Sequence, residues 1–105
     1  MKTAQRITTS PPPPGWYELR LYITGTRPQS IRAIKNIQSF CKAHLEGHYQ
    51  LQVIDLYQQP ELAARAQVVA APTLIKLMPL PIRRLVGDMS DEKQVSNGLD
   101  LSGHE

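Results

Sequence analysis

His44 and His48 are the residues in this chain whose types and spacing come closest to a metal site. On one face of a helix, histidines four residues apart place two imidazole nitrogens where one Zn²⁺ ion could bind. Gly47 lies between them and is expected to end the helix first, while the third histidine, His104, lies near the C-terminus. The pattern therefore favours a solvated helix end, and the sequence predicts no metal and no cofactor.

Nucleophilic or redox chemistry would need a cysteine whose thiolate is stabilised, typically at a helix N-terminus or in a Cys-x-x-Cys pair. The chain has one cysteine, Cys41, which falls inside a helical pattern where it suits a small apolar role. The acidic residues Asp88, Asp91 and Glu92 lie where a helix cap and helix-dipole partners are expected. We therefore predict a binding protein without enzymatic activity and with no catalytic residues.

Size and composition point to one globular unit. The chain has 105 residues, of which 41% are hydrophobic and 20% charged, as in ordinary globular domains. The net charge of +3 is modest and the basic residues are scattered, so nucleic acid is not an expected partner. No apolar run is long enough for a membrane span or a signal peptide, so we expect a cytoplasmic protein.

The chain is predicted to consist of a short tail and one domain. Residues 1–15 contain the proline run 11–14, which favours an extended, flexible segment that cannot build a core. Residues 16–105 are predicted to form the domain.

The first half of the domain reads as strand, helix, strand. Apolar residues alternate from Tyr17 as in a strand, and Gly25 ends the pattern. A capping-box spacing over residues 26–29 then begins a helix that is expected to stop at Gly47. The predicted apolar face of this helix comprises Ile31, Ile34, Ile37, Cys41 and Leu45.

The second strand is predicted over residues 50–56. Leu51, Val53 and Leu56 are expected to face inward, whereas Gln50 and Gln52 share the opposite face. Because about twenty helical residues join the two strands, they should form a parallel pair through a right-handed crossover.

The second half of the domain is predicted as helix, strand, strand, helix. A short helix follows Pro60, and strands over residues 73–78 and 82–86 are linked closely enough to form an antiparallel hairpin. Ser90 is expected to cap the last helix, which Gly98 weakens. The resulting order, β-α-β-α-β-β-α, is that of the thioredoxin fold, an α/β architecture in which a proline such as Pro72 precedes the third strand.

Three segments of the chain resemble the KaiB family of circadian clock proteins. They are LRLYITGTRPQSIRAIKNI, YQLQVIDLYQQPELA and AAPTLIKLMPLPIRRLVGDMSDEKQVSNGLDL, and they follow one another across residues 17–101. The resemblance implies a non-enzymatic regulator that binds the hexameric ATPase and kinase KaiC, sequesters KaiA and displaces the sensor kinase SasA. It also implies two folds, a homo-oligomer (tetramer or dimer) with a different C-terminal half and a thioredoxin-like monomer that binds KaiC.

The resemblance implies where partners bind. The second strand is the expected sheet edge of the thioredoxin-like form, and Gln50 and Gln52 correspond to family positions that contact partners. Five cations are further candidates for an acidic partner surface: Arg32, Lys35, Lys76, Arg83 and Arg84.

Five residues are candidates for the fold switch. Pro72, Pro79 and Pro81 are expected to make the third and fourth strands imperfect in either fold. In the family motif Gly-Leu-Asp-Leu, Gly98 and Asp100 are the positions that bias the switch, so alanine at Gly98 is expected to enrich the thioredoxin-like state.

One alternative keeps the fold and drops the switch. The chain could be a single-fold, thioredoxin-like interaction module similar to the sensor domain of SasA, without redox activity. Gln52, which replaces the usual lysine, and the proline-bearing N-terminal extension indicate a divergent paralogue that could serve a different KaiC-like protein.

Overall fold

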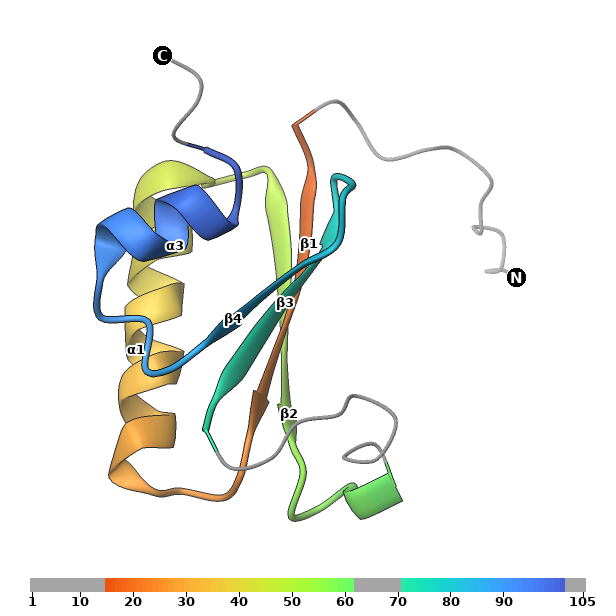
Figure 1. Ribbon diagram of the computed structural model, residues 1–105, viewed down its shortest axis with the longest axis vertical. Coiled ribbons are helices and arrows are strands. Elements are labelled where there is room, and N and C mark those ends of the chain that lie inside the picture. The colour runs from red at the N-terminus through yellow and green to blue at the C-terminus, as the bar shows by residue number, and fades with distance from the viewer. Residues whose placement is uncertain (1–14, 62–70, 102–105) are drawn as a thin grey trace.

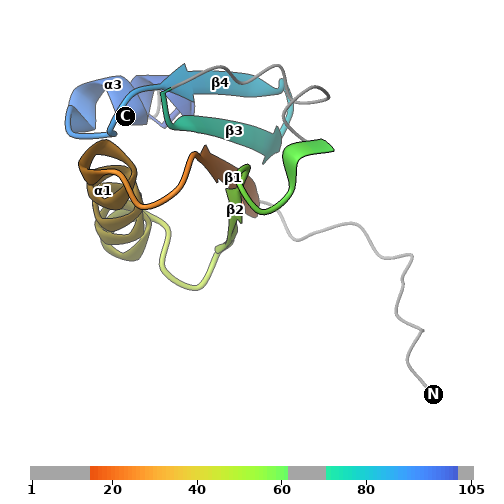
Figure 2. The same cartoon turned by 90° about the horizontal axis from the view of Figure 1, so that it is seen from below.

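A mixed sheet with two helices on one face makes up the described part of the chain. The computed structural model describes residues 15–61 and 71–101. Its elements are β1 (Tyr17–Ile23), α1 (Pro28–His44), β2 (Tyr49–Asp55), β3 (Thr73–Met78), β4 (Arg83–Val86) and α3 (Glu92–Gly98). The strand order is β2-β1-β3-β4, with β2 parallel to β1 and both β1–β3 and β3–β4 antiparallel (Figure 1). Figure 2 shows α1 and α3 together on the same side of the sheet.

Central strand β1 is buried on the helix face along its length and on the opposite face only toward its C-terminal end. Its alternate residues Leu19 and Leu21 lie in the main core between the sheet and the helices. Tyr22, which alternation places on the opposite face, is also buried and packs with Ile54 and Leu56 in a second, smaller cluster. The face opposite the helices, called the outer face below, is therefore partly apolar.

Helix α1 begins at Pro28, whose fixed φ suits the first helical turn. The predicted capping box over residues 26–29 is wrong, because the N-cap is Arg27 and its side chain makes no capping hydrogen bond. Ile37 is buried as predicted, whereas Ile31 was expected in the core but is 43% exposed, and Ala33 is buried in its place. The helical period of the apolar residues was therefore predicted correctly, but the N-terminal end of the predicted apolar face, at Ile31, was not.

Strand β2 lies at the edge of the sheet, as predicted, but one residue earlier than expected. Val53 is in register with Leu21 and so lies on the core side of the sheet, as predicted, but the residue is 38% exposed. Leu56, which was also expected to face the main core, is buried in the cluster on the outer face together with Ile54. An edge strand has no neighbour on one side to help cover its residues, which explains why the apolar pattern did not fix their burial.

The C-terminal half follows the predicted order where it is described. β3 has the predicted bounds and β4 is one residue shorter, and the two form the expected antiparallel hairpin. Pro60 and Glu61 are helical, and the remainder of the predicted short helix falls in residues 62–70, outside the described residues. Residues 1–14 of the predicted tail 1–15 also lie outside them.

Helix α3 has a different cap from the predicted one. The side chain of Asp91, rather than Ser90, accepts hydrogen bonds from the backbone N–H groups of Lys93 and Gln94. The backbone N–H of Ser90 is itself bound to Asp88 Oδ1, at 3.1 Å. The prediction was wrong by one residue because Ser and Asp are nearly equivalent caps and the preceding turn decides between them.

Prolines mark the hairpin and the start of β3. Pro72 is buried immediately before β3. Among the described residues, the peptide bonds before Pro79 and Pro81 are cis.

In the described residues, no helix combines the length and the apolar character that crossing a membrane would require.

Candidate partner-binding surface

Edge strand β2 offers backbone groups that point away from the sheet. Leu56 N–H donates to the carbonyl of Ile23 at 2.8 Å, and Tyr17 N–H donates to the carbonyl of His48 at 2.9 Å. In a parallel pair, alternate residues of a strand bond to the neighbour, so the even-numbered residues of β2 bond to β1. The peptide groups of Leu51 and Val53 therefore face the open edge, where no other described strand pairs with them.

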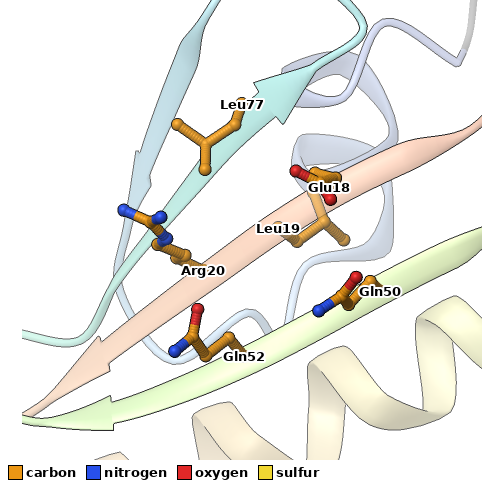
Figure 3. Close-up of a pocket in the computed structure, with 6 residues that line it drawn as sticks. All are labelled: Glu18, Leu19, Arg20, Gln50, Gln52 and Leu77. Carbon is orange, nitrogen blue, oxygen red and sulfur yellow. The ribbon is translucent and has the colours of Figure 1, made fainter. Parts of the chain in front are cut away.

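A shallow hollow lies on the outer face beside this edge (Figure 3). Its volume is about 140 Å³, and it is lined by Glu18, Leu19, Arg20, Gln50, Gln52 and Leu77. In the register of β1 and β2, Glu18 is paired with Gln50 and Arg20 with Gln52. One carboxylate, one guanidinium and two amides therefore occupy neighbouring positions on one face, next to an apolar side chain from β3.

Lys76 is not the exposed cation that the sequence predicted. Its side chain is 1% exposed, and its Nζ lies 2.8 Å from Asp100 Oδ2. Arg83, which is paired with Lys76 across β3 and β4, donates to Asp100 Oδ1 from Nη2 at 3.0 Å. Lys76 is thus inaccessible to a partner in this fold, and Arg83 is half exposed but already forms an ion pair with Asp100.

The other predicted cations do not gather at one place. Arg32 of α1 bonds to Asp88 at 3.2 Å, in the loop before α3. Lys35 is exposed on α1, and Arg84 is exposed on β4, at the opposite edge of the sheet from β2. Of the seven predicted partner-binding residues, only Gln50 and Gln52 lie together in the hollow.

The residues predicted for the fold switch have defined contacts in this fold. Asp100 has a positive φ of 62°, immediately beyond α3. Hydrogen bonds from Lys76 and then Arg83 lower the pKa of its carboxyl group. Gly98 packs closely on β4, because a Cβ atom at this position would come within 2.7 Å of Leu85 Cδ1.

Among the residues that first suggested chemistry, Cys41 is buried, and the two described histidines, His44 and His48, are exposed. Cys41 is fully buried in the main core, and burial raises the pKa of its thiol to about 12, so it carries no reactive thiolate at neutral pH. His44 ends α1 with its ring centroid 4.4 Å from that of Phe40. The His48 ring lies 3.1 Å from the Glu46 carbonyl, and His104 falls outside the described residues.

Sequence reasoning missed Glu18, Arg20 and Leu77 as part of the surface. The first two follow the same alternation as Gln50 and Gln52, so pairing the strands in register would have found them. Leu77 could not have been found in this way, because the register between β1 and β3 shifts at Glu18 and Leu19. Such a bulge depends on the assembled sheet.

A family model described as the KaiB domain matches residues 20–101 of the chain. This chain belongs to the KaiB family. It is 45% identical to the circadian clock oscillator protein KaiB of Synechococcus elongatus over 85 residues, which cover 81% of this chain and 83% of that protein. It is 44% identical to the protein of the same name from Nostoc punctiforme, again over 81% of this chain and 82% of the relative.

Solved structures show that this KaiB family member has a thioredoxin-like fold. The N-terminal domain of Synechococcus elongatus SasA superposes with a TM-score of 0.66 at 24% identity, covering 100% of this chain and 99% of that domain. Mitochondrial thioredoxin 3 of Saccharomyces cerevisiae superposes with a TM-score of 0.64 at 12% identity, covering 80% and 76%. At these identities the similarity concerns the fold alone, and it confirms the fold class that was predicted from the order of elements.

Proposed function

We propose that this KaiB family member is a non-enzymatic, cytoplasmic clock regulator that binds a KaiC-type hexameric ATPase and modulates its phosphorylation cycle. Family membership supports the clock role, and the thioredoxin-like fold is the form in which the family resemblance implies KaiC binding. A KaiA-like protein and a SasA-type kinase are the further partners that the resemblance implies.

The open edge of β2 is the observation that carries this proposal. The outward peptide groups of Leu51 and Val53 can hydrogen-bond to an added strand, which is a common mode of peptide recognition. Gln50 and Gln52, which are exposed beside that edge, would contact the side chains of the added strand. Backbone pairing then supplies affinity, and the neighbouring side chains supply selectivity.

Replacing Val53 by proline tests the edge. Proline removes a backbone donor, and at Val53 that donor faces outward, so the pairing of β2 with β1 should survive. Val53→Ala is the matched control, because it shortens the exposed side chain and keeps the N–H group. The measurement is complex formation with KaiC homologues and with a KaiA-like protein by size-exclusion chromatography, with circular dichroism to confirm folding.

We expect Val53→Pro to lose at least one of these complexes while Val53→Ala keeps them all. Gln52→Pro provides the opposite control, because its N–H group faces β1 and its loss should unfold the edge strand. If Val53→Pro is folded and forms every complex as the parent does, strand addition at β2 is excluded. If the parent binds no KaiC homologue, the proposed function itself fails.

The proposed mechanism includes a change of fold in the C-terminal half. In the thioredoxin-like form this half is held by the ion pairs of Asp100, the Asp91 cap and the packing of Gly98 on Leu85. A few contacts of this kind are enough to set a two-state balance, because a full population shift needs only about 5.5 kcal/mol. Backbone NMR spectra at low and high protein concentration test the switch. Two sets of signals whose ratio follows concentration are expected, and a single unchanging set would contradict it.

A further inference from the structure

The link between β3 and β4 is an exposed apolar turn. Leu80 is 72% exposed and Ile82 is 60% exposed, and Pro81 between them is exposed as well. Residues 79–82, called the hairpin tip below, contain no polar side chain. Surface turns are normally polar, so an apolar turn at the end of a hairpin needs a physical explanation.

The backbone of the hairpin tip is suited to leaving water. Because proline has no N–H group, only Leu80 and Ile82 of residues 79–82 carry a backbone donor. A backbone donor that leaves water without a new partner costs free energy. The two prolines therefore lower the cost of moving this turn into an apolar medium.

The hairpin is basic around its apolar tip. No acidic residue occurs over residues 71–87, and the cations in that stretch are Lys76, Arg83 and Arg84. Two acids approach the hairpin: Asp100 forms ion pairs with two of these cations, and Glu18 is paired in register with Met78. Three cations against two acids leave one positive charge in excess, and Arg84 is exposed two residues after Ile82.

Trp16 lies at the same end of the sheet as the hairpin tip. It immediately precedes β1, whose residue Glu18 is paired with Met78 at the end of β3. Figure 1 shows the start of β1 and the link between β3 and β4 at the same end of the sheet. Tryptophan is enriched at the level of lipid headgroups, where its amphipathic ring is most stable.

These groups favour a lipid surface over a protein as the occupant. A protein partner would need a pocket shaped to the tip, whereas a bilayer interface adapts to any small apolar group that enters it. The bilayer interface also accepts tryptophan and places its phosphates against arginine. The residues of the tip line neither the hollow beside β2 nor the one between β4 and α3.

We propose that the hairpin tip is a reversible attachment site for anionic membranes. Leu80 and Ile82 enter the boundary between headgroups and acyl chains, and Arg84 lies against headgroup phosphates. The ligand is a phospholipid with a net negative headgroup. Because β1 and β3 lie between β2 and β4, attachment leaves the open edge of β2 available to the proposed partners.

Vesicle binding tests the attachment without any clock partner, so its outcome is separate from that of the proposed function. Trp16 is the only tryptophan of the chain, so its fluorescence reports on this end of the sheet. With vesicles of equal parts phosphatidylcholine and phosphatidylglycerol at low salt, the parent should co-sediment and its emission should shift to the blue. Vesicles of phosphatidylcholine alone should bind about fivefold more weakly, which is the contribution of one arginine near an anionic surface.

Substitutions in the hairpin locate the attachment. Leu80→Ser and Ile82→Ser should each weaken binding about tenfold, because each removes an apolar side chain that enters the interface. Ile31→Ser is the matched control, since Ile31 is an exposed apolar residue on α1 and should have no effect. Arg84→Gln should weaken binding to anionic vesicles about fivefold, and Lys35→Gln on α1 is its control. Circular dichroism confirms that each variant is folded.

Several outcomes would overturn the proposal. A parent that neither co-sediments nor shifts its emission excludes membrane attachment, and equal binding to both kinds of vesicle excludes recognition of the anionic headgroup. Equal losses for Leu80→Ser and Ile31→Ser would show adsorption without a defined site. If vesicles do not bind, and a KaiC homologue protects the N–H groups of Leu80 and Ile82 from exchange, the tip belongs to a protein partner instead.

Discussion

Lys76 Nζ lies 2.8 Å from Asp100 Oδ2, which joins the buried face of β3 to the turn that follows α3. The lysine is almost completely buried, whereas the carboxylate is partly open to solvent and also binds Arg83. Lys76 and Arg83 are direct neighbours across two strands, where like charges repel unless an anion lies between them. Asp100 is that anion, so the turn after α3 supplies the charge that neutralises the two cations of the hairpin.

Removing the two members of this pair should have unequal effects on stability. Asp100→Asn leaves Lys76 as a buried charge without a carboxylate, so we expect a clear fall in the free energy of unfolding. Lys76→Met removes the buried charge itself and should cost less, because Asp100 keeps Arg83. The double variant Lys76→Met/Asp100→Asn should be more stable than Asp100→Asn alone. Urea unfolding followed by circular dichroism measures all three, and equal losses for both single variants would contradict this account.

Acid should weaken the fold through two carboxyl groups. The pKa of Asp100 is lowered mainly by the hydrogen bond from Lys76, and the pKa of Asp88 mainly by the hydrogen bond from Ser90, with Arg32 next. Because both pKa values are lower in the folded than in the unfolded chain, their stabilisation is complete above the unfolded pKa. It is then lost as pH falls through the folded pKa, between about pH 5 and about pH 2.

The measurement for this pH dependence is the urea midpoint as a function of pH. Asp100→Asn and Asp88→Asn should each flatten the acid limb of the curve, and the double variant should flatten it further. A curve that is identical for the parent and both variants would show that these groups have the same pKa values in the folded and unfolded chains.

The sequence and the structure assign the N-cap of α3 to different residues, Ser90 and Asp91, and substitution can decide between them. Asp91→Ala removes an acceptor for two backbone N–H groups and should cost about 1 kcal/mol of unfolding free energy, which Asp91→Ser should largely restore. Ser90→Ala should have little effect on helix capping, because the Ser90 side chain does not cap the helix. The thermal midpoint of each variant is the measurement. Amide-exchange protection of Lys93 and Gln94 that is lost in Ser90→Ala and kept in Asp91→Ala would return the cap to Ser90.

Gly98 combines a helix cost with a packing constraint. Alanine should stabilise a helical position by about 1 kcal/mol relative to glycine. In the thioredoxin-like form, however, a Cβ atom at Gly98 would meet the Leu85 side chain, which must then move. We therefore expect Gly98→Ala to be more favourable in a Leu85→Ala background than in the parent protein.

The enrichment of the thioredoxin-like state by Gly98→Ala stays a prediction, and NMR populations measure it in both backgrounds. Equal gains in the two backgrounds would show that Leu85 yields without cost. An enrichment that appears only with Leu85→Ala would show that packing, rather than helix propensity, decides the effect of this position.

The sequence alone was enough to predict the order of the described helices and strands, and the bounds of the strands to within one or two residues. Alternation from Tyr17 predicted β1, and the bounds of β3 were predicted correctly, because local periodicity reports which elements can bury an apolar face. The short link between β3 and β4 was enough to predict an antiparallel hairpin. The edge position of β2 followed from the element order once that order matched the thioredoxin fold.

Only the tertiary structure decided which charged side chains are buried and which are exposed. Lys76 and Arg84 lie on the two strands of the same hairpin, yet Lys76 is buried against Asp100 and Arg84 is exposed. Strand register and the turn after α3 determine what covers each side chain. The grouping of Glu18 with Gln50 likewise depends on which strands become neighbours. Periodicity encodes the face of an element, whereas ion pairs and hollows arise between residues far apart in the chain.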